Sequence, residues 1–333
     1  MAASAGGEID VLGIGNAIVD VLAHADESLL ATHGLAKGTM TLIDETQAKA
    51  IYQDMGPGTE ISGGSAANTM VGVASFGGRA AYIGKVRNDQ LGEVFSHDIR
   101  ASGVRFRTAP AEDGAATARC LVLVTADAQR TMNTYLGACV DLGPEDIDVD
   151  LVGAARVTYL EGYLWDPPKA KDAFRKAAEV AHGAGREVAL TLSDPFCVDR
   201  HRADFLDLVE HHVDILFANE AEITALYQVD TFDEACTRVR AHCPVAALTR
   251  SAAGSIIVTD GQVHEVEAAP VDRVLDTTGA GDLYAAGFLF GYTKGYDLPT
   301  AGRLGSLAAA EVISHIGARP EVSLMDLATD HLH

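Results

Sequence analysis

The residues 276–282, which read DTTGAGD, place two carboxylates and two glycines directly before an apolar helix pattern. From 283 to 290 an apolar stripe repeats at i, i+3, i+4 and i+7, which predicts a helix that begins near Gly279. The first N–H groups of a helix have no partner within it, and the helix dipole is positive at this end. The stretch therefore indicates an anion site beside Asp282. An acid in a first turn can also serve only to offset the dipole of its own helix, so this motif alone leaves both interpretations open.

A second glycine-rich stretch, EISGGSAAN, covers residues 60–68. Gly63 and Gly64 precede an alanine-rich pattern that predicts a helix from about Ser65 to Phe76. Asn68 lies near the start of this helix and would project towards a ligand that rests on the glycine turn, because glycine lets a ligand approach the backbone closely. Taken alone, an ordinary turn followed by a capped helix explains this stretch as well.

Several common functional motifs are absent from the sequence. No P-loop, HExxH or GxSxG pattern occurs, and Gly13-Ile14-Gly15 lacks the third glycine of a dinucleotide fingerprint. His211 and His212 fall on a polar helix pattern, which favours a solvated face over a metal site.

Composition and charge exclude some classes of partner. The formal net charge is −22, from 47 acidic and 25 basic residues, so nucleic acids and anionic membranes would be repelled. The five cysteines form no C-x-x-C pair, which predicts neither a disulfide framework nor a zinc site. The first ten residues lack the basic and apolar regions of a signal peptide, and no apolar run is long enough to span a bilayer. We therefore expect a cytoplasmic protein.

The two halves of the chain show different patterns. Apolar strand patterns that begin at Ala155, Arg186, Val213 and Cys243 alternate with helix patterns such as residues 168–185, as βαβ units on a parallel sheet require. The N-terminal half has shorter alternating segments, which predict a small second sheet exposed on one face. These are residues 37–44 and a hairpin over 117–137 with its turn at 126–129.

The order of these motifs resembles the ribokinase-like (PfkB) carbohydrate kinases over nearly the whole chain. The matching motifs are Gly63-Gly64 with Asn68, GKV at 84–86, DQLG at 89–92, NEAE at 219–222 and DTTGAGD. The resemblance implies a single kinase unit with a ribokinase-like α/β fold: a mostly parallel central sheet with helices on both faces. It also implies a small β-sheet lid, formed from about residues 16–46 and 104–138.

The resemblance implies phosphoryl transfer from ATP to a hydroxyl group. The catalytic residues that it implies are Asp282, which accepts the proton of the attacking hydroxyl, and an anion hole formed by Gly279, Ala280 and Gly281. Positioning and charge stabilisation are the main demands of this chemistry, and preorganised N–H donors supply the second.

The resemblance also implies two cation sites. Asn219 and Glu222 would hold Mg²⁺ through water, because Mg²⁺ gives up its hydration shell reluctantly. Asp276 and Thr278 would help bind a monovalent cation such as K⁺, on which members of the family depend to different degrees.

The acceptor must be chosen by the N-terminal half of the chain. There the stretch GNAIVD, residues 15–20, resembles the start of the adenosine kinases of this family. The implied acceptor-binding residues are Asn16, Asp20, Gly63, Gly64, Ser65 and Asn68, with Met40, Met132 and Tyr163 as contacts of the base. Met and Tyr at such positions are also common in a plain core.

For ATP, the strand-loop-strand pattern LTRSAAGSIIV, residues 248–258, resembles the nucleotide-binding segment of the family, with Thr249 and Gly254 near phosphate or ribose. The segment 307–319 would close over the adenine, with His315 beside it. Arg130 would reach the phosphates when the lid closes, although a surface arginine is an equally good interpretation.

These features together predict an ATP-dependent kinase that phosphorylates the 5′-hydroxyl of a nucleoside, with adenosine as the first choice. The alternative within the family is a sugar kinase, acting on ribose, fructose or 2-keto-3-deoxygluconate. A non-catalytic nucleoside-binding protein is the alternative from another class. The sequence leaves a monomer and a homodimer equally open.

Overall fold

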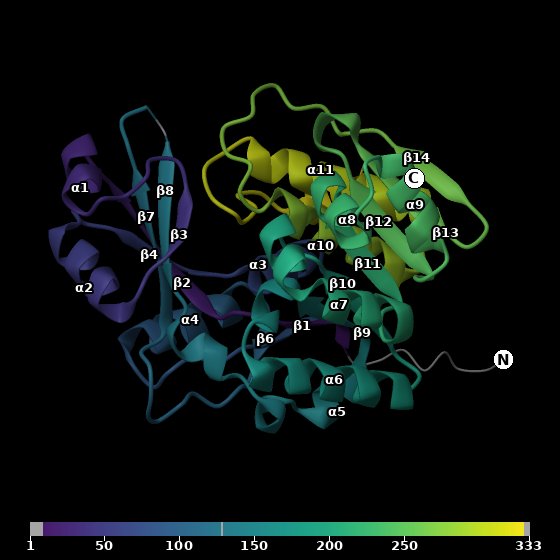
Figure 1. The fold of residues 1–333 in the computed structure, drawn as a ribbon, viewed down its shortest axis with the longest axis horizontal. Helices are drawn as coiled ribbons and strands as arrows, with labels where there is room; N and C mark the ends of the chain where they lie inside the picture. Colours follow the sequence, from purple (N-terminus) through teal and green to yellow (C-terminus); the bar gives the residue numbers. More distant parts are fainter. Residues whose placement is uncertain (1–8, 128, 330–333) are drawn as a thin grey trace.

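The computed structural model describes residues 9–127 and 129–329 and contains two β-sheets (Figure 1). The larger sheet has nine strands in the order β14-β13-β12-β11-β10-β9-β1-β5-β6, and the smaller has five in the order β3-β8-β7-β2-β4. The first eight residues, on which part of the signal-peptide expectation depends, lie outside the described residues. So does position 128 in the predicted turn at 126–129.

The large sheet is parallel from β6 to β12, and β13 and β14 extend it as antiparallel strands. Its strands are β1 (Ile9–Ile14), β5 (Ala80–Ile83), β6 (Arg105–Phe106), β9 (Ala155–Glu161), β10 (Glu187–Thr191), β11 (Ile215–Asn219), β12 (Val245–Thr249), β13 (Ser255–Thr259) and β14 (Val263–Val266). The strands predicted from the apolar runs of the second half are confirmed.

Both faces of this sheet are covered, because successive strand residues point to opposite sides. Val11 joins one core and Leu12 joins the other. The helices of the first core are α3 (Ser65–Ser75), α4 (Gln90–Ala101), α10 (Ala280–Lys294), α11 (Leu298–Ile313) and α12 (Leu324–Ala328). Those of the second are α5 (Val149–Ala154), α6 (Pro168–Gly183), α7 (Pro195–His211), α8 (Glu220–Tyr227) and α9 (Phe232–Arg240). The predicted ribokinase-like layering is confirmed.

The small sheet is covered by helices on one face. Its strands are β2 (Ile18–His24), β3 (Met40–Leu42), β4 (Thr59–Gly63), β7 (Ala118–Val124) and β8 (Arg130–Tyr135). Val19 and Val21 of β2 belong to the same core cluster as Leu30 of α1 (Glu27–Thr32) and Ile51 of α2 (Glu45–Asp54). In Figure 1 these two helices lie on the side of the small sheet that is remote from the large sheet. The opposite face of the small sheet therefore looks towards the large sheet.

Four of the five strands of the small sheet lie within the ranges predicted for the lid, and two edge strands depart from those ranges. The strand β4, which lies outside both ranges, pairs antiparallel with β2, and the pair Arg105–Phe106 lies inside one range but pairs with β5 of the large sheet. Both strands are at an edge of their sheet. An edge strand is defined by a partner far away in the sequence, so neither pairing leaves a clear local pattern.

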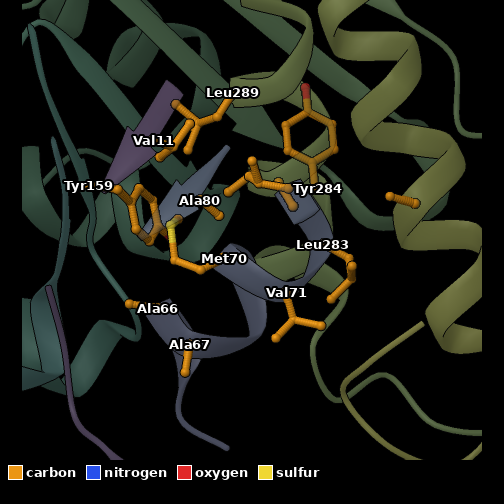
Figure 2. Packing of buried hydrophobic residues seen from close by; sticks show 14 of the residues in the cluster. Val11, Ala66, Ala67, Met70, Val71, Ala80, Tyr159, Leu283, Tyr284 and Leu289 are labelled. Carbon is orange, nitrogen blue, oxygen red and sulfur yellow. The ribbon is translucent and has the colours of Figure 1, made fainter. Parts of the chain in front are cut away.

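The helices α3 and α10 pack closely together, because small residues face each other between them. A Cβ atom on Gly72 would lie 2.6 Å from the Cβ of Ala286. Figure 2 shows Val71 of α3 beside Leu283 of α10, and Met70 of α3 beside Tyr159 of β9. This packing sets the relative position of the first turns of the two helices.

Gly287→Ala should destabilise the protein although alanine favours helices. Gly287 lies inside α10, and a Cβ atom there would meet the carbonyl oxygen of Leu304 at 2.4 Å, so α10 and α11 must separate. We expect the free energy of unfolding, measured in urea, to fall by about 1–3 kcal/mol. The matched control is Gly183→Ala at the end of α6, where a Cβ atom meets nothing within 4 Å. That variant should be neutral or gain up to about 1 kcal/mol, and equal effects at the two positions would contradict the packing argument.

Candidate active site

The centre of the site is the carboxylate of Asp282 in the first turn of α10. Its Oδ1 accepts a hydrogen bond from the Ser65 hydroxyl at 2.6 Å, and its Oδ2 accepts one from the Asn68 amide nitrogen at 3.1 Å. Both partners lie in the first turn of α3, so two helix N-termini meet at one carboxylate. Ser65 and Asn68, predicted as acceptor-binding residues, therefore contact Asp282, predicted as the catalytic residue.

The turn before α10 is open to a ligand on one side. Gly279 has a left-handed backbone, with φ of 80°, and Gly281 is exposed with no atom within 4 Å of an added Cβ. The N–H of Ala280 donates to the carbonyl of Thr277 at 3.2 Å, whereas the N–H groups of Gly279 and Gly281 have no backbone acceptor among the described residues. The N–H groups of Gly279, Ala280 and Gly281 were expected to be free to bind an anion. That of Ala280 already donates a hydrogen bond within the turn.

Asp20 lies across the site, directly against the glycine turn. A Cβ atom on Gly63 would lie 2.4 Å from Oδ2 of Asp20, and one on Gly64 would lie 2.1 Å from the carbonyl oxygen of Asn16. Gly64 also has φ of 99°, which side chains rarely adopt. Glycine is therefore required at both positions for Asn16, in the β1–β2 connection, and Asp20, on β2, to approach the turn before α3.

Burial raises the pKa of both facing carboxylates. The pKa of Asp282 rises to about 6 through burial, against the hydrogen bonds from Ser65 and Asn68. The pKa of Asp20 also rises to about 6 through burial; Arg319 and Arg130 lower it and Asp282 raises it further. Both groups are thus mainly ionised at neutral pH, but with a much higher proton affinity than an exposed aspartate.

Glu161 is a part of this region that the sequence did not reveal. It is 1% exposed at the end of β9, and its two oxygens accept hydrogen bonds from the Asn16 amide nitrogen and the Ala66 N–H, each at 2.8 Å. Burial raises its pKa to about 7, although both hydrogen bonds lower it. The available signal was an acid at the end of an otherwise apolar strand, VTYLE. Glu161 fixes Asn16 relative to the start of α3.

Asp276 connects the loop before α10 with the small sheet. It forms an ion pair with Arg130 of β8, and it accepts hydrogen bonds from the N–H and the hydroxyl of Thr278 and from the N–H of Gly317. Although burial opposes the shift, these hydrogen bonds and the charge of Arg130 lower the pKa of Asp276. Arg130 thus contacts the loop before α10. A monovalent-cation role for Asp276 and Thr278 stays a prediction.

Asn219 and Glu222 contact each other as a capping box at the start of α8. The Asn219 amide nitrogen donates to Oε1 of Glu222 at 2.6 Å, and the Asn219 N–H donates to Oε2 at 2.9 Å. Burial raises the pKa of Glu222 to about 7; the Asn219 N–H lowers it and nearby Asp194 raises it. Oxygen ligands of this kind fit Mg²⁺ held through water, since each carboxylate oxygen keeps a second lone pair. Among the described residues there is no cluster of three or more His, Cys, Asp or Glu side chains placed to hold a metal directly.

Of the three residues predicted to bind ATP, the structure places Thr249 beside Asn219. Thr249 is the register partner of Asn219 on the neighbouring strand β12. Gly254, with φ of 81°, lets the β12–β13 turn approach the carbonyl of Val266, where a Cβ atom would clash at 2.1 Å. His315 contacts Glu311 at 3.2 Å in the segment after α11. Their roles towards ATP stay predictions.

The residues predicted to contact a base are divided between the two sheets. Met40 and Met132 are register partners on β3 and β8 of the small sheet, and Met40 is 50% exposed. Tyr163 follows β9 of the large sheet, and its hydroxyl donates to the carbonyl of Ser193 at 3.2 Å. Burial, reinforced by Asp194 and Asp282, raises the pKa of Tyr163.

Two further residues near Asn68 were also missed. Arg319, after α11, donates from Nη1 to Oδ2 of Asp98 at 3.0 Å and from Nε to Oδ1 of Asn68 at 3.4 Å. Asp98, on α4, also accepts hydrogen bonds from the N–H and hydroxyl of Ser62 beside the glycine turn. No local pattern marks these residues, because their partners are distant in the sequence.

Asp282→Asn should change how stability depends on pH. The folded pKa of Asp282 lies above its unfolded value, so its contribution is complete at low pH and is lost as pH rises through about 6. The variant lacks this loss, so its free energy of unfolding relative to wild type should rise by about 1–2 kcal/mol between pH 4.5 and 8. Asp260→Asn, at an exposed turn, is the control and should parallel wild type. Urea unfolding at several pH values measures both, and a parallel Asp282→Asn curve would refute the burial argument.

Comparison with known proteins agrees with this geometry. A family model described as pfkB family carbohydrate kinase matches residues 39–323. The chain is 29% identical over 327 residues to an adenosine kinase from Saccharomyces cerevisiae, and the match covers 91% of this chain and 94% of the relative.

No described helix is both long and apolar enough to cross a membrane.

Two solved structures are similar along almost the whole chain. An adenosine kinase from Sinorhizobium meliloti is 55% identical with a TM-score of 0.90, over 97% of this chain and 99% of that chain. A probable sugar kinase protein from Rhizobium etli CFN 42 is 52% identical with a TM-score of 0.90, over 98% of this chain and 99% of that chain. With its paired glycine turns and its carboxylate at a helix start, this chain belongs to the pfkB family of carbohydrate kinases, and it is a phosphotransferase that acts on a hydroxyl group.

Proposed function

We propose that this kinase transfers the γ-phosphate of MgATP to the 5′-hydroxyl of a nucleoside, with adenosine as the preferred acceptor. The observation that carries the proposal is the chemistry of the small-sheet face that looks towards Asp282. This face combines one carboxylate, Asp20, with a group of apolar side chains. A nucleoside has the matching parts, because it joins a diol to a flat, largely apolar base.

The strand register shows which side chains share this face. Along the same face, Leu22 pairs with Val122, Val122 with Met132, and Met132 with Met40. We call these four residues the apolar strip. Asp20 is two residues before Leu22 on β2, so its side chain points to the same side. Arg130, two residues before Met132 on β8, also shares this face, and its ion pair with Asp276 requires the face to look towards α10.

The apolar strip is separate from the core that α1 and α2 cover. Val122 forms a third cluster with Cys120 and Val124, and partly buried Leu22 and Met132 pack against it. Val122 is only 1% exposed, whereas Leu22 and Met132 are partly accessible and Met40 is 50% exposed. A flat base could cover the accessible atoms of these three side chains and exclude water from them. A sugar without a base would leave them uncovered.

The polar end of the site favours an uncharged acceptor. Asp20 and Asp282 face each other, and the charge of Asp282 raises the pKa of Asp20. A further negative charge at this place would be repelled by both carboxylates. The two nearest arginines, Arg130 and Arg319, are already paired with Asp276 and Asp98. A sugar acid would therefore meet carboxylates without a free cation, whereas the vicinal hydroxyls of a ribose can donate to Asp20.

Asp282 is suited to take the proton of the attacking hydroxyl. Its pKa of about 6 makes it a stronger base than an ordinary aspartate while it stays mostly ionised at neutral pH. The open turn at Gly279–Gly281 would receive the transferring phosphoryl group at the positive end of α10. Mg²⁺, held through water by Asn219 and Glu222, would neutralise phosphate charge when it is bound.

The relatives support this choice of acceptor. Two of the similar proteins carry the name adenosine kinase, and the solved one is 55% identical to this chain. We infer that the small sheet acts as the lid, that Arg130 moves to the phosphates of ATP, and that K⁺ assists through Asp276 and Thr278. The described cysteines are all free thiols, and we infer that the protein functions in the reducing cytoplasm. Either a monomer or a homodimer is compatible with this mechanism.

The test is ADP release from MgATP with adenosine, inosine, guanosine, ribose, fructose and 2-keto-3-deoxygluconate as acceptors. We expect adenosine to give the highest kcat/KM. Asp20→Asn should raise the KM for adenosine by about 10- to 100-fold, because a hydrogen bond to a charged group is lost. With 2′,3′-dideoxyadenosine, which has no diol, the KM of Asp20→Asn should stay close to that of wild type.

The control variant is Asp26→Asn, an exposed aspartate just after β2 whose side chain makes no capping hydrogen bond. It should match wild type with every acceptor. Faster turnover of a free sugar than of adenosine would refute the nucleoside assignment. Nucleoside binding without any turnover would refute the catalytic assignment.

A further inference from the structure

We propose that Arg319 is a positioning residue of the acceptor site, which holds the Asn68 amide towards Asp282 and supplies the positive charge that faces Asp20. This inference deepens the proposed function and rests on it. Arg319 comes from the segment after α11, far in sequence from every other acceptor-side residue. Nothing in the DTTGAGD or glycine-pair motifs points to it.

The side chain of Arg319 is built into the site and is only 14% exposed. Nη1 donates to Asp98 and Nε donates to Asn68, at 3.0 Å and 3.4 Å. The remaining nitrogen, Nη2, is buried and has no partner among the described residues. Since this nitrogen is enclosed by protein, Arg319 acts on the site through its charge and through its hydrogen bonds to Asn68 and Asp98.

The first consequence concerns the orientation of the Asn68 amide. A guanidinium group can only donate hydrogen bonds, so the atom of Asn68 that faces Arg319 must be the oxygen Oδ1. The amide nitrogen is then turned to Oδ2 of Asp282, to which it donates at 3.1 Å. The flipped amide would set its oxygen against the carboxylate of Asp282, which repels it. Arg319 thus holds the proton acceptor in place through one intermediate side chain.

The second consequence concerns the charge on Asp20. The charged groups that face Asp20 are Arg319, Arg130 and Asp282, and the two arginines lower its pKa. Arg130 is engaged with Asp276, and its position changes if the small sheet moves. Arg319 belongs to the large-sheet side and stays with Asn68, so it provides a positive charge that does not depend on the lid.

Among the described residues, Asp282 has no arginine or lysine partner of its own that could replace Arg319 as a support of the site. Beyond Ser65 and Asn68, the groups that sense its charge are Asp20, Glu161, Tyr159 and Tyr163. All of them are neutral or negative. The hydrogen bond from Asn68 is therefore one of only two direct supports of the ionised form, and Arg319 keeps it correctly oriented.

The fold places Arg319 through the same glycine that begins α10. A Cβ atom on Gly279 would lie 2.8 Å from Cα of Ala318, so the C-terminal segment rests directly on the turn before Asp282. The N–H of Gly317 also donates to Asp276 at 3.1 Å. At the other end, Asp98 joins Arg319 to Ser62, next to the glycine turn. Arg319 consequently links the phosphoryl side of the site with the acceptor side.

The test compares Arg319→Gln, Arg319→Lys and the control Arg303→Gln, an exposed arginine on α11. Steady-state kinetics from pH 5 to 8 would use the acceptor that wild type turns over fastest. For Arg319→Gln we expect kcat to fall by about 10- to 100-fold. The acid limb of kcat/KM should move to higher pH, because loss of a cation raises the pKa of the facing carboxylates.

Arg319→Lys separates the two consequences. It keeps the charge, so its acid limb should stay near that of wild type. An ammonium group on this stem cannot reproduce the fork between Asn68 and Asp98, so kcat should remain about tenfold low. If Arg319→Gln fails to fold in a thermal melt, Arg319→Lys carries the test of the orientation claim.

Two results would overturn the inference. One is a folded Arg319→Gln whose kcat, KM and acid limb lie within twofold of Arg303→Gln. The other is an Arg319→Lys with the kcat of wild type. An error in the proposed acceptor would instead show in wild type alone, as a different preferred substrate, and would leave these ratios measurable.

Discussion

The hydrogen bonds that join Asp282 to Ser65 and Asn68 are the contacts on which the rest of the site depends. They connect side chains 217 and 214 residues apart in the sequence, and they form only if α3 and α10 begin at the same place. Small residues between the helices, with Gly72 opposite Ala286, permit the close packing that achieves this. The large sheet, the helix pair and the carboxylate of Asp282 are therefore one structural unit.

This arrangement brings several carboxylates together in a protein whose net charge is already negative. Asp20, Asp282 and Glu161 all have a raised pKa because each is buried. The fold offsets this with donors rather than with many cations: helix N-termini, the amides of Asn16 and Asn68, and two arginines from separate parts of the chain. In the proposed mechanism ATP would approach such a site with its phosphates towards the open end of α10 and not towards the acidic surface.

Much of the fold was predictable because its signals are local. The apolar runs of the parallel strands, the helix after Pro168 and the helix start at Gly279 follow from hydrophobic periodicity and from proline and glycine preferences. The association of Gly63, Asn68 and Asp282 was predictable only through the family resemblance. Residue spacing alone left an ordinary capped helix as a full alternative.

The remaining features depend on partners that no local pattern reveals. The edge strand β4 is defined by its pairing with β2, Glu161 by contacts with Asn16 and Ala66, and Arg319 by contacts with Asn68 and Asp98. Asn219 and Glu222 were predicted as cation ligands. The structure shows in addition that they form the capping box of α8, so the proposed cation binding would use the same two side chains that cap this helix.

The most direct measurement is a crystal structure of the protein with adenosine and the non-hydrolysable ATP analogue AMP-PCP. We expect the 5′-hydroxyl within about 2.6–3.2 Å of the Asp282 carboxylate. The ribose diol should lie on Asp20, the base against the apolar strip, and the γ-phosphate at the N-terminus of α10. A γ-phosphate bound away from α10, or adenosine bound with its ribose away from Asp20 and Asp282, would contradict the central claim.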